Sequence, residues 1–378
     1  MSHLAAVAHA KGQPFSLQPR PTPTPGPDEL LLAVKSVALN PADVLMRAHG
    51  LFIPAYPTVT GFDMAGVVLE VGSNVPTDDN PGQGPCFKRG SRVAAYAASV
   101  WKGCDPDYGA FQERCLVPWQ HALLLPKEIS WNEAATLPVA GEVPLNAWDA
   151  LGVPRVGEVP ASSSSFPSSS SSARSKTKTN ALLIWGASSS VGSMGVQSAR
   201  VLRDDPGSAI AAVYATAGVA NHQYVSELGA DRVFDYSEEQ VAEAIVAAAR
   251  EDGVVIRHCF LATGGLAGCQ AVLKAFVGDG QGSEKAKAKV ASAPVIPVDA
   301  EEVNGVDTVF VVPAEDEDER LEQFRYWMGW MRRYLADGSV RPSPGARAVG
   351  RGLESVDAGL DELAKGVSCV KLVVEVDA

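Results

Sequence analysis

The stretch Trp185–Gly195, WGASSSVGSMG, decides the fold, because it joins a short apolar run to a helix-like run through a glycine turn. A strand, a turn of small residues and a helix form the setting in which backbone N–H groups bind a pyrophosphate. Where such a turn usually carries a middle glycine this one has serine, which is small enough to let a phosphate approach. The stretch therefore predicts a dinucleotide site; an ordinary tight turn between a strand and a helix is the alternative.

The residues of this turn have separate expected roles. Gly186 makes the turn itself, and Gly192 and Gly195 allow the helix to pack closely against the strand. Ser189 and Ser190 stand where side chains must stay small, and each hydroxyl is able to donate a hydrogen bond to a phosphate oxygen.

Predicted strands and helices alternate through the region around the turn. Strands are expected at 181–185, 209–215, 232–236, 254–262 and 306–312. Helix-like runs separate them, among them VGSMGVQSARVLR, SEEQVAEAIVAAAREDG and LAGCQAVLKAF. Apolar strands that alternate with helices are typical of a parallel sheet covered on both faces. The fold class is therefore predicted as α/β, with a doubly wound parallel sheet.

The flanking regions follow other patterns. Residues 1 to about 125 predict short strands and turns, as in a small β-barrel-like domain. A capping box formed by Ser130 and Glu133 then starts a helix. After the parallel sheet come an amphipathic helix, DERLEQFRYWMGWMRRYLADG, and a last strand, VKLVVEV. We expect domains at 1–128, 129–313 and 314–378, with a serine-rich insertion at 161–180 on the side of the sheet away from the phosphate turn.

Composition excludes several classes of protein. The chain has 378 residues and a net charge of −12, and its Lys and Arg residues are scattered, which argues against a nucleic-acid binder. No apolar run reaches the length of a membrane span, and the N-terminus lacks the pattern of a secretory signal. The six cysteines include no C-x-x-C pair and are read as free thiols. We expect a cytoplasmic protein, monomer or homodimer, without nucleic-acid or membrane partners.

The end of the second strand carries the expected determinant of cofactor choice. The sequence there, VYATAGVANHQ, has no Asp or Glu to bind the ribose 2′-OH of NADH, so a 2′-phosphate would not be repelled. It has no Arg or Lys to bind that phosphate either. Thr216, Asn221 and Tyr236 are the polar candidates. We therefore expect NADPH to be preferred over NADH.

Together these stretches resemble the medium-chain dehydrogenase/reductase superfamily, in its zinc-free quinone and enoyl reductase branch. The resemblance covers nearly the whole chain and includes GFDMAGVVLEVGSNV, WGASSSVGSMGVQSAR, LGADRVFDY and GRGLESVDAGLDELAKGVSCVKLVV. It extends to the fungal group that contains stand-alone trans-acting enoyl reductases, in which a Ser-Ser-Ser-Val turn is usual. It implies a GroES-like β-barrel catalytic domain, a Rossmann domain inserted into it, and a C-terminal return to the first domain.

The resemblance also bears on metal binding. Zinc members carry a cysteine in the loop that reads LNPAD here, where Asn40 and Pro41 offer no thiolate. Phe62 replaces the histidine of their Gly-His-Glu triplet, and Asp63 is left as a carboxylate with either a structural or a pocket-supporting role. We find no set of three N, S or O ligands of the kind that catalytic zinc needs. No metal site is therefore predicted.

Further site residues follow from the resemblance. Ser188 to Val191 would line the pyrophosphate, Asn221 and Tyr236 would lie near the adenosine ribose, and Pro41 to Val44 would form the wall beside the nicotinamide, near Val367 and Ser368. The usual Ser and Lys or Arg ahead of Asn221 are Gly218 and Ala220 here, and Val44 and Leu45 replace a frequent Trp-Lys. The expected cofactor residues are Pro41, Asp43, Val44, Gly186, Ser188, Ser189, Ser190, Val191, Gly192, Thr216, Asn221, Tyr236, Val367 and Ser368.

Two classes of function remain open. The first is an enzyme, an NADPH-dependent, zinc-independent reductase that transfers hydride to a quinone or to an activated C=C bond of an enone or enoyl group. A trans-acting enoyl reductase of a fungal secondary-metabolite pathway is one form of it. The second is a non-catalytic cofactor-binding protein, since fold does not determine function.

Three residues are the candidates for polar groups beside a small-molecule acceptor: Asn40, Arg47 and Asn146. Asn146 stands where relatives often place a threonine that faces the nicotinamide, and its amide N–H would bind the oxygen on which negative charge grows. For each residue a structural role is the alternative. Asn40 precedes a proline and is placed to cap a turn, and Arg47 is able to pair with a surface acid.

Overall fold

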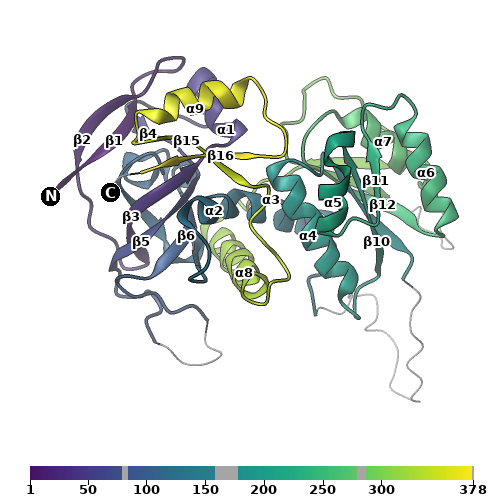
Figure 1. Cartoon of the computed structure of the whole chain (residues 1–378), viewed down its shortest axis with the longest axis horizontal. Coiled ribbons are helices and arrows are strands. Elements are labelled where there is room, and N and C mark those ends of the chain that lie inside the picture. The colour runs from purple at the N-terminus through teal and green to yellow at the C-terminus, as the bar shows by residue number, and fades with distance from the viewer. Residues whose placement is uncertain (79–83, 158–177, 279–286, 377–378) are drawn as a thin grey trace. The chain divides into compact units, whose positions relative to one another are not determined.

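The computed structural model describes residues 1–78, 84–157, 178–278 and 287–376. They form two compact units (Figure 1). Unit 1 comprises Met1–Glu142 and Ala314–Ala378, and unit 2 comprises Val143–Pro313. The first change of unit falls within helix α3 (Leu137–Leu151), further along the chain than the 128/129 boundary expected from the sequence. Most of the serine-rich insertion expected at 161–180 lies outside the described residues.

Unit 2 is built on a parallel sheet whose described strands follow the order β11-β10-β9-β12-β13-β14. Counted along the chain from β9, this is the 3-2-1-4-5-6 order of dinucleotide-binding sheets. The predicted doubly wound parallel sheet is therefore confirmed. The strands are β9 (Asn180–Trp185), β10 (Ile210–Ala217), β11 (Arg232–Asp235), β12 (Val255–Leu261), β13 (Ala288–Ser292) and β14 (Val306–Phe310).

Helices cover both faces of this sheet. Helices α4 and α5 contact each other on one face, and α6 and α7 contact each other on the opposite face (Figure 1). Strand β13 was not expected from the sequence, because its residues AKVAS include Ala and Lys, which are depleted in strands. The helices are α4 (Ser190–Asp204), the 3-10 helix η5 (Val219–Asn221), α5 (His222–Leu228), α6 (Val241–Glu251) and α7 (Leu266–Lys274).

The described residues that flank segment 158–177 are tied to the carboxyl end of α4. The Gly157 N–H donates to Asp205 Oδ2 at 3.0 Å, and the Lys178 ammonium donates to the carbonyl oxygens of Arg203 and Asp205. Helix α4 has 15 residues and rises by about 1.5 Å per residue, so these anchors lie roughly 22 Å from the turn that opens the helix. Gly157 and Lys178, the described residues on the two sides of this segment, thus contact unit 2 at the end of α4 away from that turn.

Unit 1 contains two sheets within the described residues. The larger has the order β15-β16-β3-β5-β6-β8 with β7 also paired to β3, and the smaller has the order β2-β1-β4. The last strand of the chain, β16, pairs with β3, so the C-terminal segment returns to unit 1. The strands are β1 (Ser2–Ala8), β2 (Ser16–Pro21), β3 (Glu29–Ala38), β4 (Thr58–Val59), β5 (Asp63–Val71), β6 (Arg92–Tyr96), β7 (Arg114–Pro118), β8 (Ala122–Leu124), β15 (Ala346–Arg351) and β16 (Lys371–Glu375).

One helix of unit 1 begins at the residue that the sequence predicted. The predicted capping box starts α2: Ser130 Oγ accepts the Glu133 N–H at 3.3 Å, and Glu133 Oε2 accepts the Ser130 N–H at 2.9 Å. The predicted amphipathic helix is α8, which buries Phe324, Trp327 and Met331. The helices are α1 (Pro41–His49), α2 (Trp131–Ala135), α8 (Glu317–Ala336) and α9 (Ser355–Ala364), with 3-10 helices η1 (Val100–Lys102), η2 (Pro106–Tyr108) and η3 (Trp119–His121).

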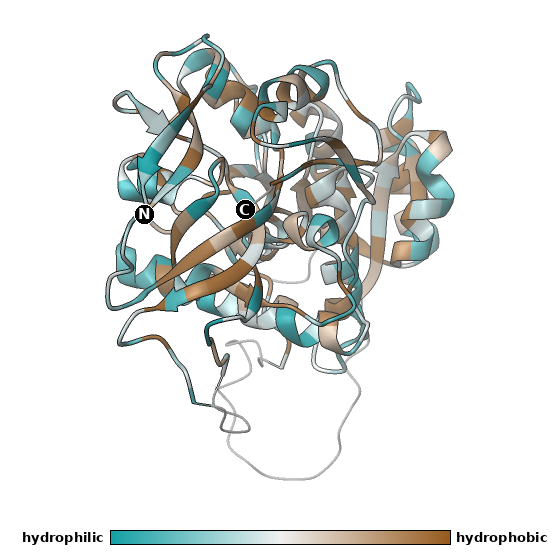
Figure 2. Cartoon of the chain, turned by 60° about the vertical axis from the view of Figure 1, so that its left-hand side comes forward, coloured by the Kyte–Doolittle hydropathy of each residue, from teal (hydrophilic) through white to brown (hydrophobic). Residues whose placement is uncertain are grey.

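Each unit has its own hydrophobic core. Hydrophobic residues run along the strands of both units (Figure 2). In unit 1 the core includes Leu32, Val68 and Phe111, and in unit 2 it includes Leu183 and Ile256. In the part of the chain that the structure describes, no helix combines the length and apolar character needed to cross a bilayer.

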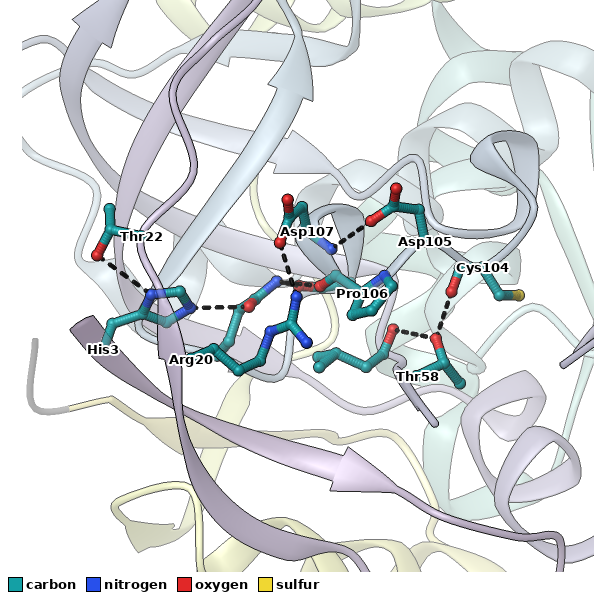
Figure 3. Close-up of polar contacts among 11 residues, drawn as sticks. His3, Arg20, Thr22, Thr58, Cys104, Asp105, Pro106 and Asp107 are labelled. Atoms are coloured by element: carbon teal, nitrogen blue, oxygen red, sulfur yellow. Dashed lines mark hydrogen bonds and ion pairs between the residues drawn. The ribbon is translucent and has the colours of Figure 1, made fainter. Parts of the chain in front are cut away.

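Polar contacts fix the loop that joins β6 to β7 (Figure 3). Thr58 Oγ1 donates to the Cys104 carbonyl oxygen at 2.5 Å, and the Arg20 guanidinium binds Asp107 at 2.8 Å. These contacts attach the loop to β4 and β2. The loop also contains η1, so the position of Trp101 is set by an anchored segment.

Candidate cofactor and acceptor site

The turn between β9 and α4 lies where the strand order of the unit 2 sheet reverses, because β10 and β12 flank β9. Gly186 has a φ of +82°, a left-handed conformation that glycine adopts without strain. A Cβ on Gly192 would lie 2.3 Å from the Gly186 carbonyl oxygen, so the start of the helix has room for glycine alone. In open parallel sheets, ligands bind at this point of reversal.

Ser189 and Ser190 have different environments in this turn. Ser189 is the N-cap of α4: its Oγ accepts the Gly192 N–H at 3.1 Å and donates to the Gly186 carbonyl at 2.8 Å. Its single hydroxyl proton is therefore used within the turn, and the expected Ser189 donation to a phosphate is not available in this geometry. Ser190 Oγ is buried and has no hydrogen-bond partner among the described residues. With the N–H groups of the first helical turn, it leaves donors that suit an anion.

Thr216 lies beneath the turn. Its side chain is fully buried, its Oγ1 accepts the Gly186 N–H at 3.0 Å, and its carbonyl oxygen accepts the Ala187 N–H at 2.8 Å. The sequence placed Thr216 among the polar candidates for the ribose. Its position favours a role in shaping the turn over a contact with the ribose.

Tyr236 and Asn221 lie at the other end of the expected cofactor site. Tyr236 follows β11 and is 54% exposed. A Cβ on Gly218, the residue after β10, would lie 3.7 Å from the Tyr236 hydroxyl oxygen. Asn221 closes η5, which begins directly after Gly218. Both side chains therefore belong to segments that leave the carboxyl ends of neighbouring strands.

An acid that sequence reasoning missed lies in the same place. Asp235 ends β11 and pairs with Ala217 of β10. The backbone N–H of Ser237 donates to its carboxylate at 2.9 Å and contributes most to lowering the pKa of Asp235, and His222 lowers it further. His222 is itself placed by its Nε2, 3.0 Å from the Ala217 carbonyl oxygen. The signal was the FDY sequence, since parallel pairing sets the end of β11 beside that of β10.

Asn40, Asp63 and Lys371 form a buried polar network in unit 1. Lys371 Nζ lies 3.2 Å from Asp63 Oδ2, and the two side chains are 5% and 0% exposed. Asn40 Nδ2 donates to the same carboxylate at 3.0 Å, and the Lys371 ammonium donates to Asn40 Oδ1 at 2.5 Å. The Val139 N–H, in the first turn of α3, donates to Asp63 Oδ1 at 2.8 Å. The network thus joins β5, β16, α3 and the segment between β3 and α1.

The network extends to Asp43 in the first turn of α1. Asp43 Oδ2 accepts the Asn40 N–H at 2.8 Å, whereas its Oδ1 is buried without a partner among the described residues. Burial raises the pKa of Asp43 to about 7, and the carboxylate of Asp63 adds to this effect. Both ends of the Asn40 amide are occupied within the network. This favours the structural alternative for Asn40, as the residue that fixes the start of α1.

Arg47 is also held within unit 1. It lies in the last turn of α1, and its guanidinium donates to Asp357 Oδ1 at 2.9 Å, to the Asp357 carbonyl oxygen at 3.1 Å and to the Asp361 carboxylate. Both acids are on α9. These contacts favour the structural alternative for Arg47, because its donors bind α1 to α9.

The remaining expected residues are divided between the units. Asn146 is buried in α3 within unit 2, two residues after Pro144, which lies inside the helix. Val44 and Val367 pack against the core of unit 1. Pro41 opens α1, and Ser368 lies between α9 and β16. The structure therefore brings the turn residues together in unit 2 and gathers Asn40 and Asp43 with Asp63 and Lys371 in unit 1.

Known proteins are similar to one part of this chain and to nearly all of it. The family model described as alcohol dehydrogenase GroES-like domain matches residues 26–127, within unit 1. Trans-enoyl reductase tndF of Aspergillus flavipes is 39% identical over 98% of this chain and 98% of its own length. Trans-enoyl reductase tazE of Aspergillus terreus is 38% identical over 83% of this chain and 93% of its own length.

The chain belongs to the medium-chain dehydrogenase/reductase superfamily. Solved structures share its fold: an alcohol dehydrogenase superfamily protein from Novosphingobium aromaticivorans has a TM-score of 0.73 at 20% identity, covering 99% of this chain and 100% of that one. CurK enoyl reductase has a TM-score of 0.68 at 18% identity, covering 99% of each chain. The relatives confirm the resemblance to the quinone and enoyl reductase branch and show that this superfamily member is an oxidoreductase. The non-catalytic alternative loses its support.

The residues of this medium-chain reductase do not fit a catalytic zinc at the positions that zinc members use. Asn40 and Phe62 provide neither a thiolate nor an imidazole. The one carboxylate, Asp63, accepts hydrogen bonds at both oxygens and has the Lys371 ammonium 3.2 Å away. A cation so close opposes a second cation on the same oxygen. The absence of bound zinc stays a prediction.

Proposed function

We propose that this oxidoreductase is an NADPH-dependent, zinc-independent reductase that transfers hydride to the activated C=C bond of an enoyl or enone acceptor. The observation that supports it most strongly is similarity along almost the whole chain to a protein named a trans-enoyl reductase, tndF. The β9–α4 turn supports a dinucleotide cofactor independently. A trans-acting role on a fungal secondary metabolite is the corresponding proposal for its biological setting.

The cofactor residues divide into a phosphate end and a ribose end. Gly186, Gly192 and the backbone of Ser188 to Val191 would hold the pyrophosphate. The Ser190 hydroxyl, which has no partner within the residues that the structure describes, would be a further donor. Asn221 and Tyr236 would contact the adenosine ribose. Asp235 introduces a negative charge there that partly opposes a 2′-phosphate. We therefore propose a modest preference for NADPH.

The bound cofactor supplies the hydride, and the side chains of this protein orient the acceptor and stabilise the charge that grows on it. Asn146 is the proposed hydrogen-bond donor to the acceptor oxygen. Pro41, Asp43 and Val44 would form the wall beside the nicotinamide, near Val367 and Ser368. Asn40 acts by positioning, since its amide binds Asp63 and Lys371.

A panel of acceptors tests this proposal. Purified protein with NADPH is given an enoyl thioester, an enone and a simple quinone, and NADPH consumption and product are measured for each. We expect the enoyl thioester or the enone to be reduced at its C=C bond, faster than the quinone. If only the quinone is reduced, the acceptor is a quinone and not an activated C=C bond. If none of the three is reduced, the reductase proposal is wrong.

A further inference from the structure

Tyr96 is the last residue of β6, and it lies at the same end of the unit 1 sheet as Asn40. In the sheet register Ala38 of β3 pairs with Asp63 of β5, and Asp63 pairs with Tyr96 of β6. Asn40 follows β3 by two residues and is bonded to Asp63. Asn40 and the residues after it form the proposed nicotinamide wall, so the register puts Tyr96 at the acceptor end of this sheet. The inference below rests on the proposed reductase function.

Aromatic rings surround Tyr96. Its ring centroid lies 5.8 Å from that of Phe62, 4.9 Å from that of Phe324 and 5.9 Å from that of His121. Tyr96 keeps 7% of its surface exposed. Burial in these surroundings, with the Glu142 carboxylate adding to it, raises the pKa of Tyr96 well above its usual value, so the hydroxyl keeps its proton across the working range of pH. It is a neutral hydrogen-bond donor in a site of low dielectric.

Polar atoms without partners lie beside Tyr96. Trp101 follows Tyr96 by five residues in the chain, and its Nε1 is buried with no hydrogen-bond partner among the described residues. The Arg320 guanidinium lies 4.7 Å above the Trp101 ring. His121 Nδ1 is 3.3 Å from the Tyr96 carbonyl oxygen and must donate to it, so its Nε2, also buried and unpartnered, is an acceptor. Buried atoms of this kind are few in folded proteins, and a catalytic role is one recognised reason for them.

The loop that carries Trp101 is anchored rather than free. Thr58 holds the Cys104 carbonyl, and Arg20 holds Asp107 (Figure 3). Trp101 and Tyr96 are therefore presented by a fixed loop and the end of a strand. Donors fixed in place before the reaction stabilise developing charge without the cost of reorganisation.

We propose that the Tyr96 hydroxyl donates a hydrogen bond to the carbonyl oxygen of the α,β-unsaturated acceptor, with the Trp101 indole N–H as a second donor. Hydride from NADPH forms a C–H bond at the β-carbon, and the C=C π pair moves to give an enolate with its charge on that oxygen. Water then supplies the proton to the α-carbon. The O–H bond of Tyr96 stays intact, NADPH is oxidised by two electrons, and the C=C bond is reduced by the same two.

The test replaces Tyr96 by phenylalanine, which keeps the ring and removes only the hydroxyl. We expect kcat for the enone to fall by about 10²-fold or more, as for the loss of one donor to an oxyanion, with NADPH affinity unchanged. The penalty should grow as the acceptor becomes less electrophilic, which a merely structural role would not cause. Tyr108→Phe is the matched control, because Tyr108 donates to Glu29 in the same unit, and its kcat should equal that of the wild type.

The outcomes separate this inference from the function on which it rests. A wild-type protein that reduces the enone and a Tyr96→Phe variant within about threefold of it would overturn the role of Tyr96 alone. A wild-type protein that binds NADPH and reduces none of the acceptors would overturn the proposed function and this inference together. If Tyr96→Phe proves unstable, Trp101→Phe removes the neighbouring donor, and an unchanged dependence on acceptor electrophilicity would count against the donor pair.

Discussion

The β9–α4 turn of unit 2 and the Asn40–Asp63–Lys371 network of unit 1 are built in opposite ways. The side-chain hydrogen bonds of Ser189 that shape the turn join residues three positions apart, and Thr216 on the adjacent strand adds one more. The network joins residues from three distant parts of the chain, and its Lys371–Asn40 contact spans 331 positions. The turn could therefore be read from a motif, whereas the network depends on the sheet register of the folded unit.

The two regions also differ in the charge they present. The turn provides N–H groups and the Ser190 hydroxyl, which has no hydrogen-bond partner in the described part of the chain, and together they suit a negatively charged ligand. The network keeps an ammonium and a carboxylate paired away from water, so its charges serve one another. At the position where the resemblance places zinc ligands this chain holds a buried ion pair, whereas the turn keeps its donors for the proposed pyrophosphate.

Removing the cation of the network should have the largest effect. In Lys371→Met the buried Asp63 carboxylate loses its counter-charge, and we expect the free energy of unfolding to fall by about 3–5 kcal/mol, measured by chemical denaturation. Arg351→Met is the control, because the Arg351–Glu375 pair is exposed and should contribute at most about 1 kcal/mol. A Lys371→Met protein as stable as the control variant would show that the network carries no structural charge pair.

Asn146 belongs neither to the β9–α4 turn nor to the Asn40–Asp63–Lys371 network. It is buried in helix α3 of unit 2, and the resemblance suggested it as a site residue. If its amide donates to the acceptor oxygen, Asn146→Ala should lower kcat by about 10²-fold while NADPH affinity barely changes, in single-turnover and binding assays. Asn146→Gln, which keeps the amide, is the informative partner variant. An unchanged kcat in Asn146→Ala would remove this residue from the mechanism.

The next effect tests the turn. In Gly192→Ala the new Cβ would lie 2.3 Å from the Gly186 carbonyl oxygen, so the start of α4 must shift. We expect the Kd for NADPH to rise more than tenfold, about 1.4 kcal/mol, in fluorescence titration. In Gly207→Ala, beyond the other end of α4, the Cβ meets only Asp205 oxygens at 3.7 and 3.8 Å, and affinity should hold. Equal affinities in the two variants would contradict the phosphate assignment.

The smallest effect concerns the ribose end. Tyr236→Phe should weaken NADPH binding by roughly 0.5–1.5 kcal/mol, the usual range for one hydrogen bond, and NADPH should bind better than NADH to the wild type. The loss should be greater for NADPH than for NADH if the hydroxyl contacts the 2′-phosphate. Tighter binding of NADH by the wild type would reverse the cofactor assignment.

The sequence anticipated features whose causes are local. The capping box at Ser130 and Glu133 and the strand, turn and helix around Gly186 formed as expected, because each depends on residues a few positions apart. Strand β13 was missed, since its residues have little strand preference and its neighbours in the sheet make it a strand. Lys371 was overlooked for a related reason, because pairing between strands sets its partners and no local pattern records them. The FDY sequence shows Asp235, but only the pairing of β11 with β10 places it beside the end of β10.

The central claim is that this medium-chain reductase reduces an activated C=C bond without a metal. The most direct test measures the zinc content of the purified protein and its turnover of an enoyl thioester with NADPH before and after chelation. We expect far less than one zinc per chain, a turnover unchanged by chelation, and no oxidation of simple alcohols. About one zinc per chain that is lost together with activity, or efficient alcohol oxidation by the chelated protein, would contradict it.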